Sequence, residues 1–334
     1  MAFLRKNISD LPAQGSDSRD QLSAQSRRGA VATRRRAFFA LAIVCFFWGT
    51  TWLGSKQGVK YMPALEMVGM RHLIAGICYV IFFTFKGYRW PRGRDWATII
   101  LLGSLNFLFS NGLNTWGVEY ISAGLASIIA AVFPLWLVII NLFTVRAPLP
   151  RGALAGLLTG FAGVCIIFAE HLHDFLNNDF RFGIILSVIA TWAWALGTIV
   201  TKQKASSFNP YFSLGFQMIF SGAVLCSTQK IMGSAVNITQ IPWQAWAALA
   251  YLVSIGSIIS FIAYIYALQH LPAAQTSIYA YINPVVAVIF GGILFGERLT
   301  VFIAIGGLVA LIGVYLVDRA YKLPSTVPEA AETA

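Results

Sequence analysis

One arginine lies inside a long apolar stretch of this sequence and is the residue best suited to hold a ligand there. Arg71 follows Pro63 by eight residues, so a helix that begins after the proline carries its guanidinium about 12 Å along the axis. An ionisable group in such surroundings is a functional hypothesis by default, and a guanidinium binds a carboxylate through two parallel hydrogen bonds. We predict that Arg71 binds a ligand. The alternative is a structural pair with Glu66, Glu119 or backbone carbonyl groups.

Three titratable side chains in or beside apolar stretches are able to carry protons. His72 titrates near neutral pH and lies on a different helix face from Arg71. Glu66 lies one turn into the same helix, and Glu119 lies at the boundary of a later stretch. A packing role for His72 and an interfacial position for the two carboxylates are the competing explanations. His72, Glu66 and Glu119 are candidates for proton coupling, and the sequence does not select among them.

Two tryptophans at matching positions of the two halves could stack on a planar or apolar ligand. Trp48 and Trp194 are 146 residues apart. Aromatic belts at membrane interfaces are the usual cause of such enrichment. Further residues with amide or hydroxyl groups could complete a polar cavity lining: Asn106, Asn111, Asn114, Gln217, Tyr281 and Asn283. Asparagine bridges between helices are the competing explanation for the amides.

Two lysines end the helices that carry these tryptophans. Lys56 and Lys202 each follow their tryptophan by eight residues, or about 12 Å. Snorkelling of the ammonium group to lipid headgroups is the ordinary explanation. Because the two lysines fall at opposite mouths of one cavity in the topology derived below, we also consider a gating or ligand-guiding role.

The sequence carries no recognisable catalytic or cofactor motif. It has no Walker A phosphate loop, no HExxH and no GxSxG. The one metal-like string, at 171–174, has no third ligand nearby. We therefore predict no metal, no cofactor and no enzymatic activity. A membrane enzyme and a non-transporting membrane sensor are the alternatives.

The composition indicates a membrane protein. Of the 334 residues, 57% are hydrophobic and 11% are charged, whereas a soluble domain has about 25% charged residues. The formal net charge of +11 comes from bases beside apolar runs, where they oppose anionic headgroups. No nucleic-acid partner is expected. The four cysteines lie inside apolar runs without metal-ligand spacing and are interpreted as packing residues.

Ten apolar runs reach the roughly 20 residues that a bilayer core requires. They lie at approximately 38–55, 64–85, 96–115, 122–144, 152–169, 181–200, 210–229, 244–267, 273–295 and 300–318. We predict an all-α membrane protein with ten transmembrane helices. Lys and Arg number 18 on one set of flanks and 5 on the other, so both termini are expected to be cytoplasmic. Residues 1–36 and 320–334 are predicted to be disordered tails, the first of them basic.

The two halves of the chain repeat each other. Residues 105–168 align on 255–318 at an offset of 150, and the earlier part of each half aligns at an offset of 146. Five helices per half is an odd number, so the second half enters the membrane from the opposite side. We predict two inverted-topology repeats, at 37–170 and 180–319, and alternating access to a site between them. Arg71 and its repeat equivalent Gln217 are expected to face one central cavity.

Matching glycines mark the fifth helix of each half. Gly156 and Gly163 recur as Gly306 and Gly313. Small residues let membrane helices approach closely. We expect the helices at 152–169 and 300–318 to pack tightly.

Four segments carry a resemblance to a known family. They are WGTTWLGSK (48–56), GMRHLIAG (69–76), WAWALGTIVTK (192–202) and YAYINPVVAVIFGGILFGERLT (279–300). Over residues 38–318 the sequence resembles the EamA-type permeases of the drug/metabolite transporter superfamily. The resemblance implies a central cavity lined by the first four helices of each half, with the fifth and tenth helices packing outside.

The resemblance also implies a function. Members of this superfamily export amino acids, metabolites or toxic compounds. We expect a secondary transporter, and specifically an exporter, in the plasma (inner) membrane of a bacterium. Its partners are then a small-molecule substrate and the lipid bilayer. The substrate, the coupling ion and a possible homodimer stay open.

Overall fold

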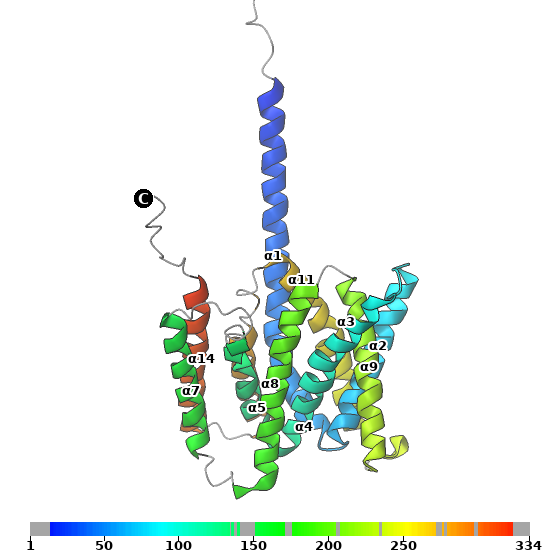
Figure 1. Cartoon of the computed structure of the whole chain (residues 1–334), viewed down its shortest axis with the longest axis vertical. Coiled ribbons are helices and arrows are strands. Elements are labelled where there is room, and N and C mark those ends of the chain that lie inside the picture. Colours follow the sequence, from blue (N-terminus) through cyan, green and yellow to red (C-terminus); the bar gives the residue numbers. More distant parts are fainter. Residues whose placement is uncertain are drawn as a thin grey trace, which may run out of the picture.

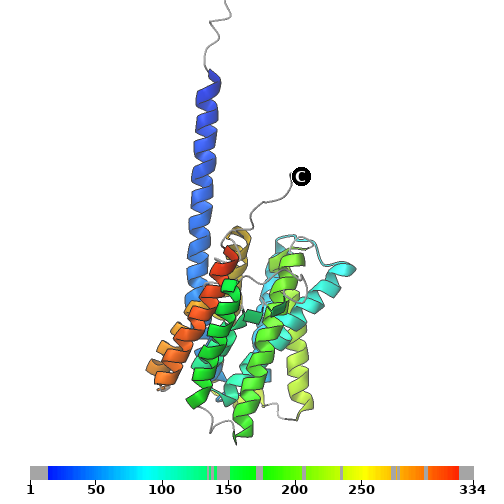
Figure 2. The same cartoon turned by 60° about the vertical axis from the view of Figure 1, so that its left-hand side comes forward.

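A computed structural model of the chain shows a bundle of helices (Figures 1 and 2). The structure describes residues 14–133, 135–136, 139–140, 151–170, 176–204, 208–233, 236–271, 276, 279–296 and 300–322. Within these residues every regular element is a helix and no strand occurs. A helix satisfies its backbone hydrogen bonds internally, which a chain this apolar requires in a bilayer.

The helices are named in chain order. They are α1 (Gln14–Gly58), α2 (Ala64–Phe85), α3 (Arg94–Leu102), η1 (Gly103–Gly112), α4 (Leu113–Tyr120), α5 (Ala123–Ala131), α7 (Arg151–Glu170), α8 (Asn178–Lys204), α9 (Pro210–Ile231), η3 (Ile238–Gln240), α10 (Trp243–Tyr251), η4 (Leu252–Ile259), α11 (Ser260–His270), α13 (Tyr279–Phe295) and α14 (Val301–Lys322). Two rods are built alike, because α3–η1–α4 and α10–η4–α11 each run without a break through a π-helical middle. π-Helical segments often occur at functional sites.

Six helical segments of the described chain are long and apolar enough to cross a membrane. They are Val31–Gly58, Ala64–Phe85, Arg94–Tyr120, Asn178–Thr201, Pro210–Ile231 and Trp243–His270. Shorter apolar helices at Gly152–Gly163, Ile282–Phe295 and Val301–Gly313 lie within three more of the expected spans. The expected span at 122–144 contains α5, and its residues 134, 137–138 and 141–144 lie outside the described ones.

The start of α1 differs from our expectation. Residues 14–36 were predicted to be disordered but are helical, and this part of α1 projects beyond the bundle (Figures 1 and 2). Once a helix is nucleated, each added residue gains one backbone hydrogen bond, so a helix anchored in the bundle can continue into a polar segment. From residue 31 onwards, where the structure describes side chains, Ala37 is the first buried residue, whereas Val31 is exposed. At the other end, α14 continues to Lys322, slightly past the expected boundary.

Two helix pairs pack with their backbones close together. α2 lies against α9, and α7 lies against α14 at the opposite flank of the bundle (Figure 1). A Cβ atom added at Gly76 would lie 2.7 Å from the carbonyl oxygen of Gly215. One added at Gly163 would lie 2.6 Å from the carbonyl oxygen of Gly306. Only glycine permits these contacts, and the tight packing expected for the fifth helices is confirmed.

Candidate functional site

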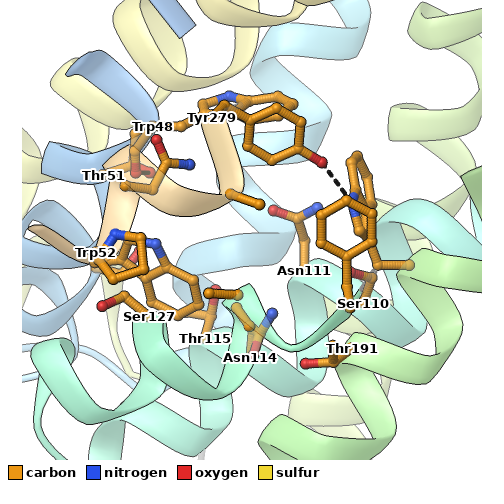
Figure 3. Close-up of a pocket in the computed structure, with 18 of the residues that line it drawn as sticks. Trp48, Thr51, Trp52, Ser110, Asn111, Asn114, Thr115, Ser127, Thr191 and Tyr279 are labelled. Carbon is orange, nitrogen blue, oxygen red and sulfur yellow. Dashed lines mark hydrogen bonds between the residues drawn. The ribbon is translucent and has the colours of Figure 1, made fainter. Parts of the chain in front are cut away.

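A cavity between the helices contains Arg71, and we call it the Arg71 cavity. Its volume is about 130 Å³. Figure 3 shows its labelled side chains around a common space, with Trp48 and Tyr279 on one side and Asn114, Thr115 and Thr191 on the opposite side. Its polar lining residues besides Arg71 are Thr51, Ser55, Ser110, Asn111, Asn114, Thr115, Ser127, Thr191 and Asn283.

Aromatic rings form one wall of the Arg71 cavity. Trp48 and Trp194 meet edge to face with ring centroids 5.9 Å apart, so the structure brings the two matching tryptophans together. Trp194 Nε1 donates to Tyr279 Oη at 3.0 Å, and Tyr279 stacks on Phe133 with centroids 5.9 Å apart. Trp48 Nε1 donates to the carbonyl oxygen of Gly256 at 3.3 Å. Because the indole donors are used within the protein, this wall offers a ligand ring faces and edges.

Arg71 is almost fully buried, with 4% of its surface exposed. Its Nε donates to Ser257 Oγ at 2.7 Å. No carboxylate of the described residues lies within ion-pair distance of it. Glu66 instead accepts from the backbone N–H of Val236 and Glu119 from that of Ala64. The alternative explanation, a structural ion pair between Arg71 and either glutamate, is therefore wrong.

The amide side chains divide between two places. Asn111, Asn114 and Asn283 line the Arg71 cavity. Asn111 Nδ2 donates to the carbonyl oxygen of Asn106 at 2.8 Å. Asn106 itself belongs to a different cavity, where its Nδ2 reaches Thr201 Oγ1 at 3.4 Å. The side chain of Tyr281, also a predicted lining residue, lies outside the described part of the structure.

The second cavity contains Gln217, and we call it the Gln217 cavity. Its volume is about 450 Å³, and its walls come from α3, η1, α8, α9 and α11. Gln217 Nε2 donates to Ser213 Oγ at 2.8 Å. Trp194 and Phe261 line both cavities and therefore stand between them.

The expectation that Arg71 and Gln217 face one cavity is wrong. Each lies seven residues after the first residue of its helix, Arg71 in α2 and Gln217 in α9. The contacts of Gly69 with Gly222 and of Gly76 with Gly215 show that α2 and α9 are antiparallel. Arg71 lines one cavity and Gln217 lines the other, and Trp194 and Phe261 line both.

Four of the candidates for proton coupling and gating, His72, Glu66, Glu119 and Lys56, are not among the described lining residues of either cavity. His72 is 1% exposed, with Nδ1 3.1 Å from Ser221 Oγ and its ring edge on Phe107. Lys56 Nζ donates to the carbonyl oxygens of Val118 and Ile121 at 2.5 and 2.7 Å. An ammonium group there stabilises the carboxyl end of α4. The side chain of Lys202 lies outside the described residues.

Several lining residues were not found from the sequence, although a signal for them existed. Trp48, Thr51, Trp52 and Ser55 follow the i, i+3, i+4, i+7 spacing of one helix face, and all four line the Arg71 cavity. Extending the face of Trp48 along its helix predicts the two hydroxyl groups. Phe261 had no such signal, because an apolar residue in an apolar helix does not show which face meets a cavity.

The fold and these cavities define a multi-pass integral membrane protein, and comparison with known proteins gives its family. Residues 35–169 and 181–318 each match the EamA-like transporter family. The chain belongs to this family, as the resemblance implied, and is a membrane transporter.

Relatives occur in bacteria and plants. The chain is 31% identical over 267 residues to the uncharacterized inner membrane transporter YedA of Escherichia coli, covering 79% of this chain and 83% of that protein. It is 24% identical to the uncharacterized transporter YvbV of Bacillus subtilis, covering 86% and 93%. It is 25% identical to a WAT1-related chloroplastic protein of Arabidopsis thaliana, covering 82% and 67%. A crystal structure of another protein matches with a TM-score of 0.62 at 14% identity, over 85% of this chain and 97% of that one, which shows a shared fold.

Proposed function

We propose that this protein is a secondary transporter that exports small organic molecules by alternating access. In this proposal ten transmembrane helices form two inverted five-helix repeats, and both termini are cytoplasmic. The Arg71 cavity and the Gln217 cavity are then the two ends of one path. Trp194 and Phe261 form the barrier that the substrate must pass.

The observation that carries the proposal is a correspondence between the two cavities. Eight lining residues of the Arg71 cavity have their repeat equivalents, at offsets of 146 or 150, in the lining of the Gln217 cavity. The pairs are Trp48 and Trp194, Trp52 and Thr198, Ser55 and Thr201, Arg71 and Gln217, Asn111 and Phe261, Asn114 and Tyr264, Thr115 and Ile265, and Val118 and Leu268. An inverted repeat places equivalent surfaces at opposite membrane faces, as alternating access requires.

Close helix contacts support the same symmetry. The repeat relation turns the contact of Gly69 with Gly222 into that of Gly215 with Gly76, and both occur. Likewise Gly163 approaches Gly306, and Gly313 approaches Gly156. These are the contacts expected where a two-fold axis in the membrane plane passes between paired helices.

The proposed orientation places the larger cavity towards the cytoplasm. The Gln217 cavity is lined by Asp95 near the start of α3, Pro210 at the start of α9 and Leu271 just past α11. These helix ends lie towards the same end of the bundle as the projecting part of α1 (Figure 1). With a cytoplasmic N-terminus, the larger cavity faces the side from which an exporter takes its substrate.

Counterflow in liposomes tests this proposal. Purified protein is reconstituted, and uptake of labelled organic compounds is measured with and without the same unlabelled compound inside. An alternating-access carrier takes up the labelled compound faster when unlabelled compound is inside, because a carrier loaded with unlabelled compound returns across the membrane faster than an empty one. A channel gives no acceleration, and a non-transporting sensor gives no protein-dependent uptake. A protonophore in parallel samples shows whether proton exchange drives net transport.

A further inference from the structure

We propose that the Arg71 cavity binds a small organic monoanion: one ring-sized apolar body bearing a single carboxylate or sulfonate that Arg71 holds. The transport of such a molecule rests on the function proposed above. Its binding does not, and is tested separately.

The formal charge of the cavity is the first reason to expect an anion. Arg71 and Tyr279 are the only titratable residues among the described lining residues, so Arg71 supplies the only formal charge there. A buried, uncompensated guanidinium in a membrane protein costs several kcal/mol. A bound anion removes that cost, and one guanidinium neutralises one negative charge.

The hydrogen bonding of Arg71 is the second reason to expect a carboxylate or a sulfonate. Among the described residues its one hydrogen bond is from Nε to Ser257 Oγ, at 2.7 Å. That bond fixes the side chain and leaves both terminal nitrogens for a ligand. A Cβ atom added at Gly256 would lie 3.0 Å from Nη2, so the absence of a side chain at this position lets the terminal nitrogen lie there. Two free N–H groups in a planar fork match a carboxylate or a sulfonate.

The aromatic lining and the volume of the cavity are the reasons to expect a body the size of one ring. The rings of Trp48, Trp194, Phe261 and Tyr279 are among the residues that line the cavity. Its volume of about 130 Å³ is close to the roughly 150 Å³ of an engineered cavity that binds benzene. One aromatic or alicyclic ring therefore fits, and a dinucleotide or a large drug does not.

The same lining disfavours the other charge types. A cation would meet Arg71 with no carboxylate among the described lining residues to offset the repulsion. A zwitterion would bring an ammonium group within a few ångströms of the guanidinium. A dianion would keep one charge without a partner in a low-dielectric site.

Four one-ring probes separate these possibilities. They are benzoate, the isosteric neutral benzamide, the cation benzylamine and the zwitterion phenylglycine. Binding to the purified protein in detergent is measured by isothermal titration calorimetry at pH 7. We expect benzoate to bind about tenfold or more tightly than benzamide, because charge-assisted hydrogen bonds contribute more than neutral ones. Phenylglycine and benzylamine should bind more weakly than benzoate.

Variants assign the preference to one residue. In Arg71→Gln the preference for benzoate over benzamide should disappear, and in Arg71→Lys it should be reduced but kept. Arg181→Gln is the matched control, because Arg181 is exposed and outside both cavities. Benzoate that binds no better than benzamide to the wild type overturns the proposal even if Arg71→Gln does not fold. So does a preference that survives in Arg71→Gln, or tightest binding of benzylamine or phenylglycine. Absence of counterflow with normal benzoate binding would instead refute the transport function.

Discussion

The substitution Gly76→Ala tests whether the close approach of α2 to α9 stabilises the bundle. The added Cβ atom would lie 2.7 Å from the Gly215 carbonyl oxygen and 2.9 Å from the Ile219 backbone nitrogen. Backbone atoms cannot turn away as side chains do. α2 and α9 must therefore separate by about 0.7 Å before ordinary contact at 3.4 Å is restored. Overpacking of this kind costs about 1–3 kcal/mol.

The matched control is Gly307→Ala in α14. Among the described residues, its added Cβ atom would meet only Ile128 Cδ1, at an ordinary 3.7 Å. Helix propensity favours alanine by about 1 kcal/mol at both positions, so the difference between the variants reports the contact. Unfolding in one detergent is followed by circular dichroism. We expect Gly76→Ala to be less stable than the wild type and Gly307→Ala to be at least as stable. Equal stability of the two variants would refute the reasoning.

Topology, the lysine at the end of α1 and the tryptophan–tyrosine hydrogen bond give three more predictions. In a cysteine-free background, a cysteine at Asn178 should label with an impermeant reagent from outside and one at Arg92 should not; the reverse pattern contradicts a cytoplasmic N-terminus. Lys56→Met should lower thermal stability by about 1.5–3 kcal/mol because two backbone acceptors lose a charged donor, and an unchanged melting temperature would favour snorkelling. Trp194→Phe and Tyr279→Phe should each weaken benzoate binding. Because both substitutions remove the same hydrogen bond, the double variant should bind benzoate about as well as the single variant with the lower affinity, and fully additive losses would contradict the link.

Hydropathy predicts an all-helical membrane protein, which the described residues confirm, whereas the arrangement as two inverted repeats stays a prediction. Apolar length alone locates the helices, because a membrane leaves a chain few other structures. The helical start of α1 could not be predicted from hydropathy, because the polar segment 14–36 has no apolar pattern. Its helix depends on continuity with the apolar part of α1 that follows it. The π-helical middles of the two rods also leave no apolar signature.

The site was predicted in its residue types more than in its arrangement. Arg71, Trp48 and Trp194 were found because charge and matched aromatic positions stand out against an apolar background, and all three line one cavity. Gln217 was assigned to the same cavity because sequence equivalence was taken to mean a shared site. If the two halves form the proposed inverted repeat, equivalent residues lie towards opposite sides of the membrane. His72 has suitable chemistry, but only packing shows that it turns towards Ser221 and Phe107.

The asymmetry between the two cavities bears on what drives transport. Arg71, Asn111 and Asn114 on one side are replaced by Gln217, Phe261 and Tyr264 on the other. In the proposed path we therefore expect an anion to bind with different affinities at the two ends. Different affinities change the substrate concentrations at which each side saturates. They cannot move the final gradient, because the carrier returns to the same state in each cycle.

A monoanion needs no proton to leave a cell, because the inside-negative membrane potential already favours its exit. The potential is worth about 2.3 kcal/mol per elementary charge per 100 mV, or roughly fortyfold in concentration. This agrees with His72, Glu66 and Glu119 lying outside both cavities. We expect protein-dependent flux of labelled benzenesulfonate, an anion at any ordinary pH, to follow a potassium–valinomycin potential imposed on liposomes and to reverse when its sign is reversed. Liposomes with Arg71→Gln should lose this flux, and those with the exposed variant Arg181→Gln should keep it. Flux that ignores the potential but responds to a pH gradient would show that the anion moves together with a proton, and a titratable group such as Asp95 in the Gln217 cavity would then have to take part.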